Sequence, residues 1–177
     1  HYSQPSSALI KMYLGGEFGS HPADVNAYAA STFYAVDRYA SYKKVWGKWY
    51  EQGGLVVSDR YTTSNAVHQA SKEPEEKRKD FLKWLYELEY DHMGLPRPDL
   101  VLYLDVPTDF TEMLLRSREA ATGTHADIHE ADTQYLSASR RMGRSAAEYY
   151  GWTLISCVEK GKMRSIQDIH EEIYRYV

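Results

Sequence analysis

Asp59 and Arg60 stand side by side where a short apolar run, residues 55–58, comes to an end. A guanidinium can donate two parallel hydrogen bonds to phosphate oxygens, and a carboxylate in such a place can hold the Mg²⁺ that bridges nucleotide phosphates. For the pair taken alone, a surface ion pair between neighbours is an equally good interpretation. Hydroxyl and amide side chains follow at once, in residues 62–65, and they favour a site for a phosphorylated ligand.

These side chains need elements that position them. We expect 55–58 to be a buried strand, because ligands of an open parallel sheet bind beyond the carboxyl ends of its strands, and the N-terminus of the next helix adds N–H donors for phosphate. Strands are also expected at 99–106 and 153–158, and helices at 5–14, 25–52, after 60, from 74, at 109–118, at 130–150 and from 165. This alternation predicts an α/β fold with a parallel sheet flanked by helices.

Composition limits the other possibilities. The chain has 177 residues, which suits one domain spanning 1–177, and its net charge of −4 argues against nucleic acid or an anionic membrane as a partner. No apolar run has the length of a membrane span, and the opening residues show no signal-peptide pattern. A single cysteine, Cys157, excludes an internal disulfide and favours the cytoplasm.

Several segments, in order, resemble the thymidylate kinase family. DRYTTSNAVHQ, residues 59–69, resembles that family's DRY-x-x-S-x-x-A-[YF]-Q segment, and FYAVDR, 33–38, is similar to its F-x-A-x-R helix. LPRPDLVLYLDVP, 95–107, is similar to its P-x-P-D-L strand, and RSREAATGTHADIHE, 116–130, occupies the place of its lid. Because the segments come in the family's order and spacing, together they indicate the family more strongly than each does alone.

The resemblance implies a P-loop α/β kinase that transfers the γ-phosphoryl group of ATP to dTMP with Mg²⁺, forming dTDP. It implies that Arg60 holds the dTMP phosphate, that Tyr34 stacks on the base and that Arg38 reaches the base edge. The resemblance also implies contacts to the nucleotide from Ser64, Asn65, His68 and Gln69, and contacts to ATP from the lid residues Arg116, Arg118 and His125. It implies catalytic roles for Asp59, Arg60 and Arg118, and contact with the metal for Asp59. The family is typically a homodimer, and the aromatic-rich helix at 25–52 leads us to expect one here.

The sequence also departs from the family pattern. His68 stands where Tyr or Phe is usual, which puts strict rejection of ribose in doubt, and the lid has few basic residues. The G-x-x-x-x-G-K-[ST] loop that cradles ATP phosphates has no match. We therefore expect this sequence to be an N-terminally incomplete kinase domain, lacking the first strand and the P-loop helix, and inactive by itself.

Other interpretations remain open. The chain could belong to another nucleoside monophosphate or deoxynucleoside kinase, or to a non-catalytic nucleotide-binding relative. YKKVWGKWY, 42–50, interleaves Lys with aromatics as nucleic-acid stacking surfaces do, but its helical spacing favours a packed helix. His125 and His129 have the spacing of a zinc pair on a helix, although the resemblance to the lid explains them better.

Overall fold

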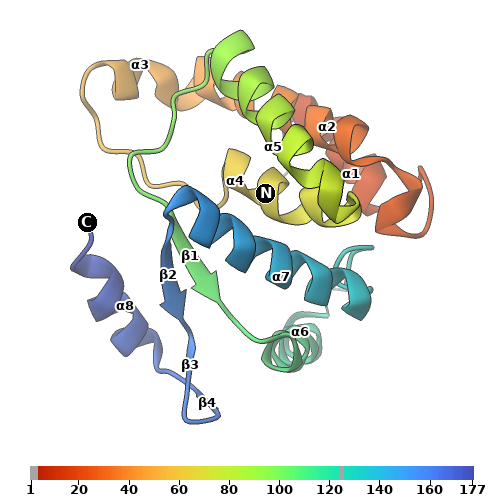
Figure 1. Ribbon diagram of the computed structural model, residues 1–177, viewed down its shortest axis with the longest axis vertical. Coiled ribbons are helices and arrows are strands. Elements are labelled where there is room, and N and C mark those ends of the chain that lie inside the picture. Colours follow the sequence, from red (N-terminus) through yellow and green to blue (C-terminus); the bar gives the residue numbers. More distant parts are fainter. Residues whose placement is uncertain (1–3, 124–125) are drawn as a thin grey trace. The chain divides into compact units, whose positions relative to one another are not determined.

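Helices make up the first part of the chain. The computed structural model describes residues 4–123 and 126–177, and its contacts divide the chain into two compact units, His1–Arg97 and Pro98–Val177 (Figure 1). The elements of the first unit are η1 (Pro5–Ser7), α1 (Ala8–Leu14), η2 (Pro22–Asp24), α2 (Ala27–Ser41), η3 (Tyr42–Trp46), α3 (Gly47–Glu51), α4 (Thr62–His68), η4 (Ala70–Lys72), η5 (Glu75–Lys77), α5 (Arg78–Tyr86) and η6 (Glu87–His92).

The long helix predicted at 25–52 is confirmed as α2, η3 and α3 in succession. Asn26 caps its start, because the side-chain oxygen accepts a hydrogen bond of 2.8 Å from the Ala29 N–H. The middle piece, η3, is a π-helix. Small residues on the buried side of α2, such as Ala30 and Ala35, let neighbouring helices approach closely.

The core of this unit forms where α1, α2 and α5 pack together. Ile10 and Tyr13 of α1 are almost completely buried, as are Phe81 and Leu85 of α5. Figure 1 shows α2 and α5 running side by side. Phe81 and Leu85, one helical turn apart, therefore lie on the face that α5 buries.

The prediction of a strand at 55–58 is wrong. These residues have no regular secondary structure, and no described strand pairs with them. Leu55 and Val57 expose 75% and 84% of their surface. A strand requires neighbours that take up its backbone N–H and C=O groups, and without them the segment is a connection leading to Asp59.

The second unit is built around a parallel pair of strands. β1 (Leu102–Asp105) pairs with β2 (Thr153–Ser156), with Leu102 opposite Thr153 and Asp105 opposite Ser156. The parallel pairing is confirmed, but among the described residues the parallel sheet has these 2 strands only, and the structure is mostly helical. The other elements are α6 (Thr108–Thr122), α7 (Thr133–Tyr150), a hairpin of β3 (Val158–Glu159) and β4 (Lys162–Met163), and α8 (Ile166–Tyr174).

Helices flank the pair on two sides, with α7 on one side and α8 on the other (Figure 1). α6 extends to Thr122, beyond the helix expected at 109–118, and ends at Gly123, whose φ of 66° is one that glycine adopts without strain. α7 begins at Thr133 because Asp132 caps it, accepting a 2.9 Å hydrogen bond from the Tyr135 N–H. None of the described helices combines the length and apolar content that crossing a bilayer requires.

Candidate functional site

The Asp59–Arg60 turn has an unusual backbone. Arg60 has a φ of 69°, which is rare for a residue with a side chain. The Ser58 hydroxyl donates a hydrogen bond of 2.6 Å to the Arg60 carbonyl and holds the turn. A non-glycine residue held in this region costs about 1–3 kcal/mol, and such residues cluster at functional sites. The turn therefore gives the sequence-predicted Arg60 a second, structural reason for attention.

Both side chains of the turn face solvent. The Arg60 Nη2 lies 3.4 Å from Nε2 of His68, at the end of α4, and the guanidinium is the donor in this contact. The Asp59 carboxylate is exposed and pairs with no group in the described residues. Mg²⁺ in kinases is commonly held by one or two carboxylates together with substrate phosphates, so a single free carboxylate fits that chemistry. Within the described ranges, no cluster of three or more His, Cys, Asp and Glu could hold a metal ion by itself.

A buried carboxylate accepts hydrogen bonds from the helix that follows the turn. Glu89, in the π-helix η6, is 0% exposed. It accepts hydrogen bonds from Arg38 Nε at 2.5 Å and Nη2 at 3.3 Å, from the Thr62 hydroxyl at 3.0 Å and from Asn65 Nδ2 at 3.2 Å. We call these four residues the Glu89 network. It joins three elements that are remote in sequence: α2, α4 and η6.

Arg38 is held on one edge and one face. Its Nε and Nη2 point at Glu89, and its guanidinium carbon lies 5.3 Å from the centre of the Tyr61 ring. Burial raises the pKa of Tyr61, and burial likewise raises the pKa of Tyr90 to about 12, so both rings stay neutral at physiological pH. The Nη1 group of Arg38 makes no hydrogen bond within the described part of the chain, and is left as a donor.

Asn65 is fixed in one orientation. Its Nδ2 donates to Glu89 and, at 3.3 Å, to the backbone carbonyl of Ser31. Both partners are acceptors only, which determines which end of the amide is nitrogen. The Oδ1 atom is the free end, because no described residue donates to it. Arg38 and Asn65 thus share one buried partner and each keep one complementary group.

Tyr34 is half-buried on α2 and packs edge-to-face on Tyr13, with ring centres 6.5 Å apart and planes at 81°. Tyr13 is itself anchored, since its hydroxyl accepts a 2.7 Å hydrogen bond from Lys72 Nζ. Lys72 also donates to the Val25 carbonyl at 3.1 Å. Burial lowers the pKa of Lys72 to about 8.

Ser64 and Gln69 complete the predicted segment in different ways. Ser64 is half-buried on α4. Gln69 is only 1% exposed, and neither end of its carboxamide has a hydrogen-bond partner in the structure as described. Buried polar groups are normally paired, so the amide oxygen and nitrogen of Gln69 are groups with which bound water or a ligand would form hydrogen bonds.

The predicted lid residues lie in the second unit. Arg118 makes two hydrogen bonds to Glu130, of 3.0 and 2.6 Å, whereas the Arg116 side chain is exposed. Such an exposed pair contributes up to about 1 kcal/mol and breaks easily. His125 lies outside the described residues.

Sequence reasoning missed two buried acids. Glu89 continues the helical spacing of Phe81 and Leu85, so a charged residue on an apolar stripe was the available signal. Asp105, at the end of β1, is 4% exposed and binds Arg140, at 2.7 and 3.0 Å, and Arg144. Burial alone would raise the pKa of Asp105, but hydrogen bonds and positive charge from the arginines outweigh it and hold the pKa below its ordinary value.

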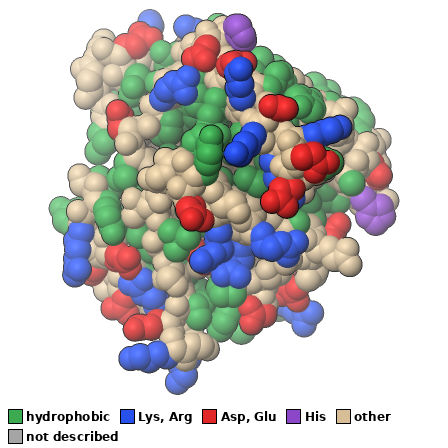
Figure 2. All heavy atoms as spheres, in the orientation of Figure 1, with side chains coloured by type: hydrophobic (Ala, Val, Ile, Leu, Met, Phe, Trp, Pro, Cys, Tyr) green, Lys and Arg blue, Asp and Glu red, His purple; other side chains and the backbone are tan. Residues whose placement is uncertain are grey.

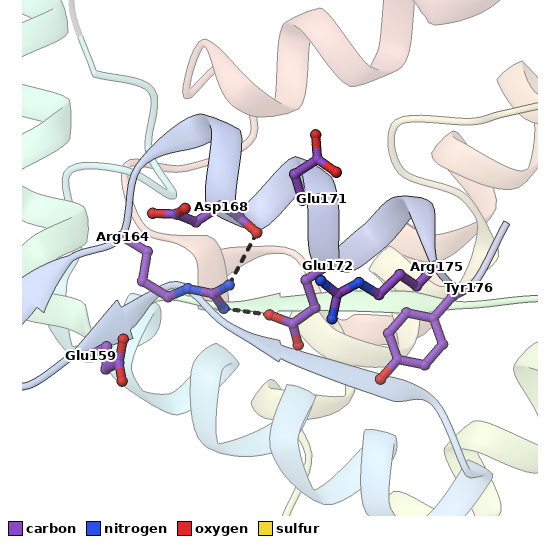
Figure 3. A pocket seen from close by; sticks show the side chains of 7 residues that line it. All are labelled: Glu159, Arg164, Asp168, Glu171, Glu172, Arg175 and Tyr176. Carbon is purple, nitrogen blue, oxygen red and sulfur yellow. Dashed lines mark hydrogen bonds and ion pairs between the residues drawn. The ribbon is translucent and has the colours of Figure 1, made fainter.

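The second unit has a hollow on its surface. It measures about 870 Å³ and is lined by Glu159, Arg164, Asp168, Glu171, Glu172, Arg175 and Tyr176. Figure 3 shows Arg164 directed at the Glu172 carboxylate, 2.5 Å away, and at the Asp168 carbonyl at 3.1 Å. Arg164 and Glu172 thus form an ion pair within this hollow. On the face drawn in Figure 2, acidic and basic side chains are interspersed.

Comparison with known proteins adds independent information. The family model described as thymidylate kinase matches residues 12–173. The chain is 30% identical over 144 residues to a thymidylate kinase of Mycobacterium tuberculosis, a match that covers 78% of this chain and 64% of that protein. Proteins named probable thymidylate kinase from Pyrobaculum aerophilum and Pyrococcus abyssi are 28% and 26% identical, over 83% and 84% of this chain and 69% and 64% of their own lengths.

Proposed function

Because the chain belongs to the thymidylate kinase family, we propose that the protein phosphorylates dTMP to dTDP with ATP and Mg²⁺, and that its first unit carries the dTMP site. The family is a family of P-loop kinases that use these substrates and this metal. The matched region spans 64% of the length of the Mycobacterium tuberculosis relative, so the activity of the whole protein is part of the proposal.

The observation that carries the proposal is the pair of groups left free by the Glu89 network. Arg38 offers a donor through Nη1, and Asn65 offers an acceptor through Oδ1. Thymine presents an acceptor at O4 beside a donor at N3–H. Cytosine presents a donor at N4 beside an acceptor at N3, which is the opposite order. Uracil shares the thymine pattern at this edge.

The other predicted residues suit the rest of the nucleotide. Tyr34 offers a half-buried ring held on edge by Tyr13, which suits stacking on a base. Arg60 would bind the phosphate through its exposed side chain, whose guanidinium lies 3.4 Å from His68 Nε2. Asp59 would hold Mg²⁺, which when bound offsets negative charge on the transferring phosphoryl group.

Arg116 and Arg118 are proposed to contact ATP. For Arg118 this requires release from Glu130, at the small cost of an exposed ion pair. The family's homodimer stays a prediction. Val36, Val45 and Trp49 are exposed by 53%, 75% and 47%, and are side chains that such an interface would cover.

Calorimetric titration of the chain with dTMP, dUMP, dCMP and thymidine tests the dTMP site. We expect dTMP and dUMP to bind more tightly than dCMP. In Arg60→Ala, dTMP should bind at least about tenfold more weakly, because a hydrogen bond to a charged group contributes about 1.5–3 kcal/mol, whereas thymidine should bind as before.

Arg97→Ala is the matched control, because it removes an exposed arginine of the same unit, paired with Asp91. It should leave all four affinities unchanged. Equal affinity of the unaltered chain for dTMP and dCMP would refute the base site. Unchanged dTMP affinity in Arg60→Ala would remove Arg60 from the phosphate site.

A further inference from the structure

We infer that Glu89 is a positioning residue for base selection: it holds Arg38 and Asn65 so that the site presents a donor beside an acceptor. This inference rests on the proposed dTMP site. Glu89 need not touch the nucleotide, since its carboxylate is completely buried and already accepts four hydrogen bonds from Arg38, Thr62 and Asn65.

Joining helices through a buried carboxylate has a cost in free energy. Burying an ion carries a large desolvation penalty, and apolar side chains of similar size often stabilise a protein as well or better. The surrounding contacts of α5, at Phe81 and Leu85, are apolar and fully buried. A function other than packing is therefore the better explanation for an acid at the next position of this stripe.

The chemistry of Glu89 determines what its neighbours present. An ionised carboxylate only accepts hydrogen bonds, so Asn65 must turn its nitrogen inward, and Oδ1 becomes the free atom. The same carboxylate engages Nε and Nη2 of Arg38 and leaves Nη1. With Gln at position 89, one end of the side chain would be a donor facing a donor. Asn65 or Arg38 would then have to reorient, and the fixed polarity would be lost.

The local backbone brings Glu89 to this place. η6 is a π-helix that continues α5, and its buried residues are Glu89 and Tyr90. Single π-turns inside helices are frequent at functional sites because they change the direction of side chains. Asp91 lies in the same π-helix but is exposed and pairs with Arg97 at 2.8 Å. Asp91 is thus a matched acid outside the network.

The test compares the unaltered chain with Glu89→Gln, Glu89→Asp and the control Asp91→Asn, by calorimetric titration with dTMP, dCMP and inorganic phosphate. We expect Glu89→Gln to reduce the preference for dTMP over dCMP by about tenfold or more, the factor that corresponds to one hydrogen bond to a charged group. Phosphate affinity should not change. Glu89→Asp keeps the charge and should retain part of the preference, and Asp91→Asn should retain all of it.

The outcomes separate the two proposals. If the unaltered chain does not distinguish dTMP from dCMP, the proposed base site fails. If it does, and Glu89→Gln distinguishes them equally well, the role of Glu89 is refuted. A uniform loss of affinity for all ligands, phosphate included, would indicate a purely structural role and also overturn the inference.

Should the Glu89 variants fail to fold, the unaltered chain decides. By NMR, the Arg38 Nε–H and the Asn65 Nδ2 protons should be protected from exchange with solvent both with and without dTMP, because their partner is buried. Rapid exchange in either state would show that these groups are not held by Glu89, and would refute the inference.

Discussion

Lys72 provides a test of the structure around Tyr34 that needs no ligand. Its ammonium group donates to the Tyr13 hydroxyl at 2.7 Å and to the Val25 carbonyl at 3.1 Å, and Tyr13 supports Tyr34 edge-to-face. Burial lowers the pKa of Lys72 from 10.5 to about 8. The perturbation is Lys72→Met, which keeps an unbranched side chain but cannot titrate.

The sign and size of the effect follow from linkage. Because the pKa is lower in the folded chain, the unfolded chain binds more protons at this site between about pH 8 and 10.5. The free energy of unfolding of the unaltered protein therefore rises with pH through this window. The full shift corresponds to about 3 kcal/mol, and about 2 kcal/mol of it falls between pH 7 and pH 9.5.

The assay is urea denaturation at those two pH values, followed by tryptophan fluorescence, to which Trp46, Trp49 and Trp84 of the first unit contribute together with Trp152 of the second. The unaltered chain should gain about 2 kcal/mol relative to Lys72→Met between the low and the high pH. Ionising tyrosines affect both proteins and cancel in the difference. Lys77→Met, at an exposed lysine, is the control for the loss of a lysine. If the Lys72→Met difference does not vary with pH, Lys72 is not buried as described.

Two further predictions concern single side chains. Tyr34→Ala should weaken the binding of thymidine and of dTMP by the same factor, roughly tenfold, because base stacking on an aromatic ring contributes about 1–3 kcal/mol. Calorimetric titration would contradict stacking if only the affinity for dTMP fell. Asp105→Asn should lower the free energy of unfolding of the second unit by about 1–3 kcal/mol at pH 7, because Arg140 and Arg144 lose their charged partner. Since the folded pKa of Asp105 is depressed, this difference should disappear as the pH falls through that pKa, and a difference that persists in acid would contradict the ion pairs.

Local signals in the sequence identified most helices correctly. The helix expected from 165 begins directly after its cap, Ser165, and this effect acts within one turn of the chain. The helix expected from 25 begins at Ala27, after its cap Asn26. The strand at 55–58 could not be decided in this way. Apolar residues there satisfy the local pattern, but a strand exists only where another strand supplies hydrogen bonds, and that information is not local.

For the candidate site, too, the sequence carried the local information but not the contacts between distant residues. Arg38, Asn65 and Arg60 were predicted from motif positions, but their partners in the structure were not. The contact between Arg38 and Glu89 joins residues separated by 51 positions, and that between Asn65 and Glu89 spans 24. Helix spacing places Glu89 on a buried face and therefore predicts a buried charge. Only the packing of α2, α4 and η6 reveals which donors satisfy it.

The two costly features of the first unit point to the same use. Arg60 adopts a φ of 69° that glycine would adopt without strain, and Glu89 is a charge in a place that an apolar residue could fill. Each costs on the order of kcal/mol, against a total stability of about 5–15 kcal/mol for a typical domain. Stability alone would favour replacing both. Their presence is explained if Arg60 must reach a phosphate while Glu89 holds Arg38 and Asn65 for the base, because binding one nucleotide then requires both at once.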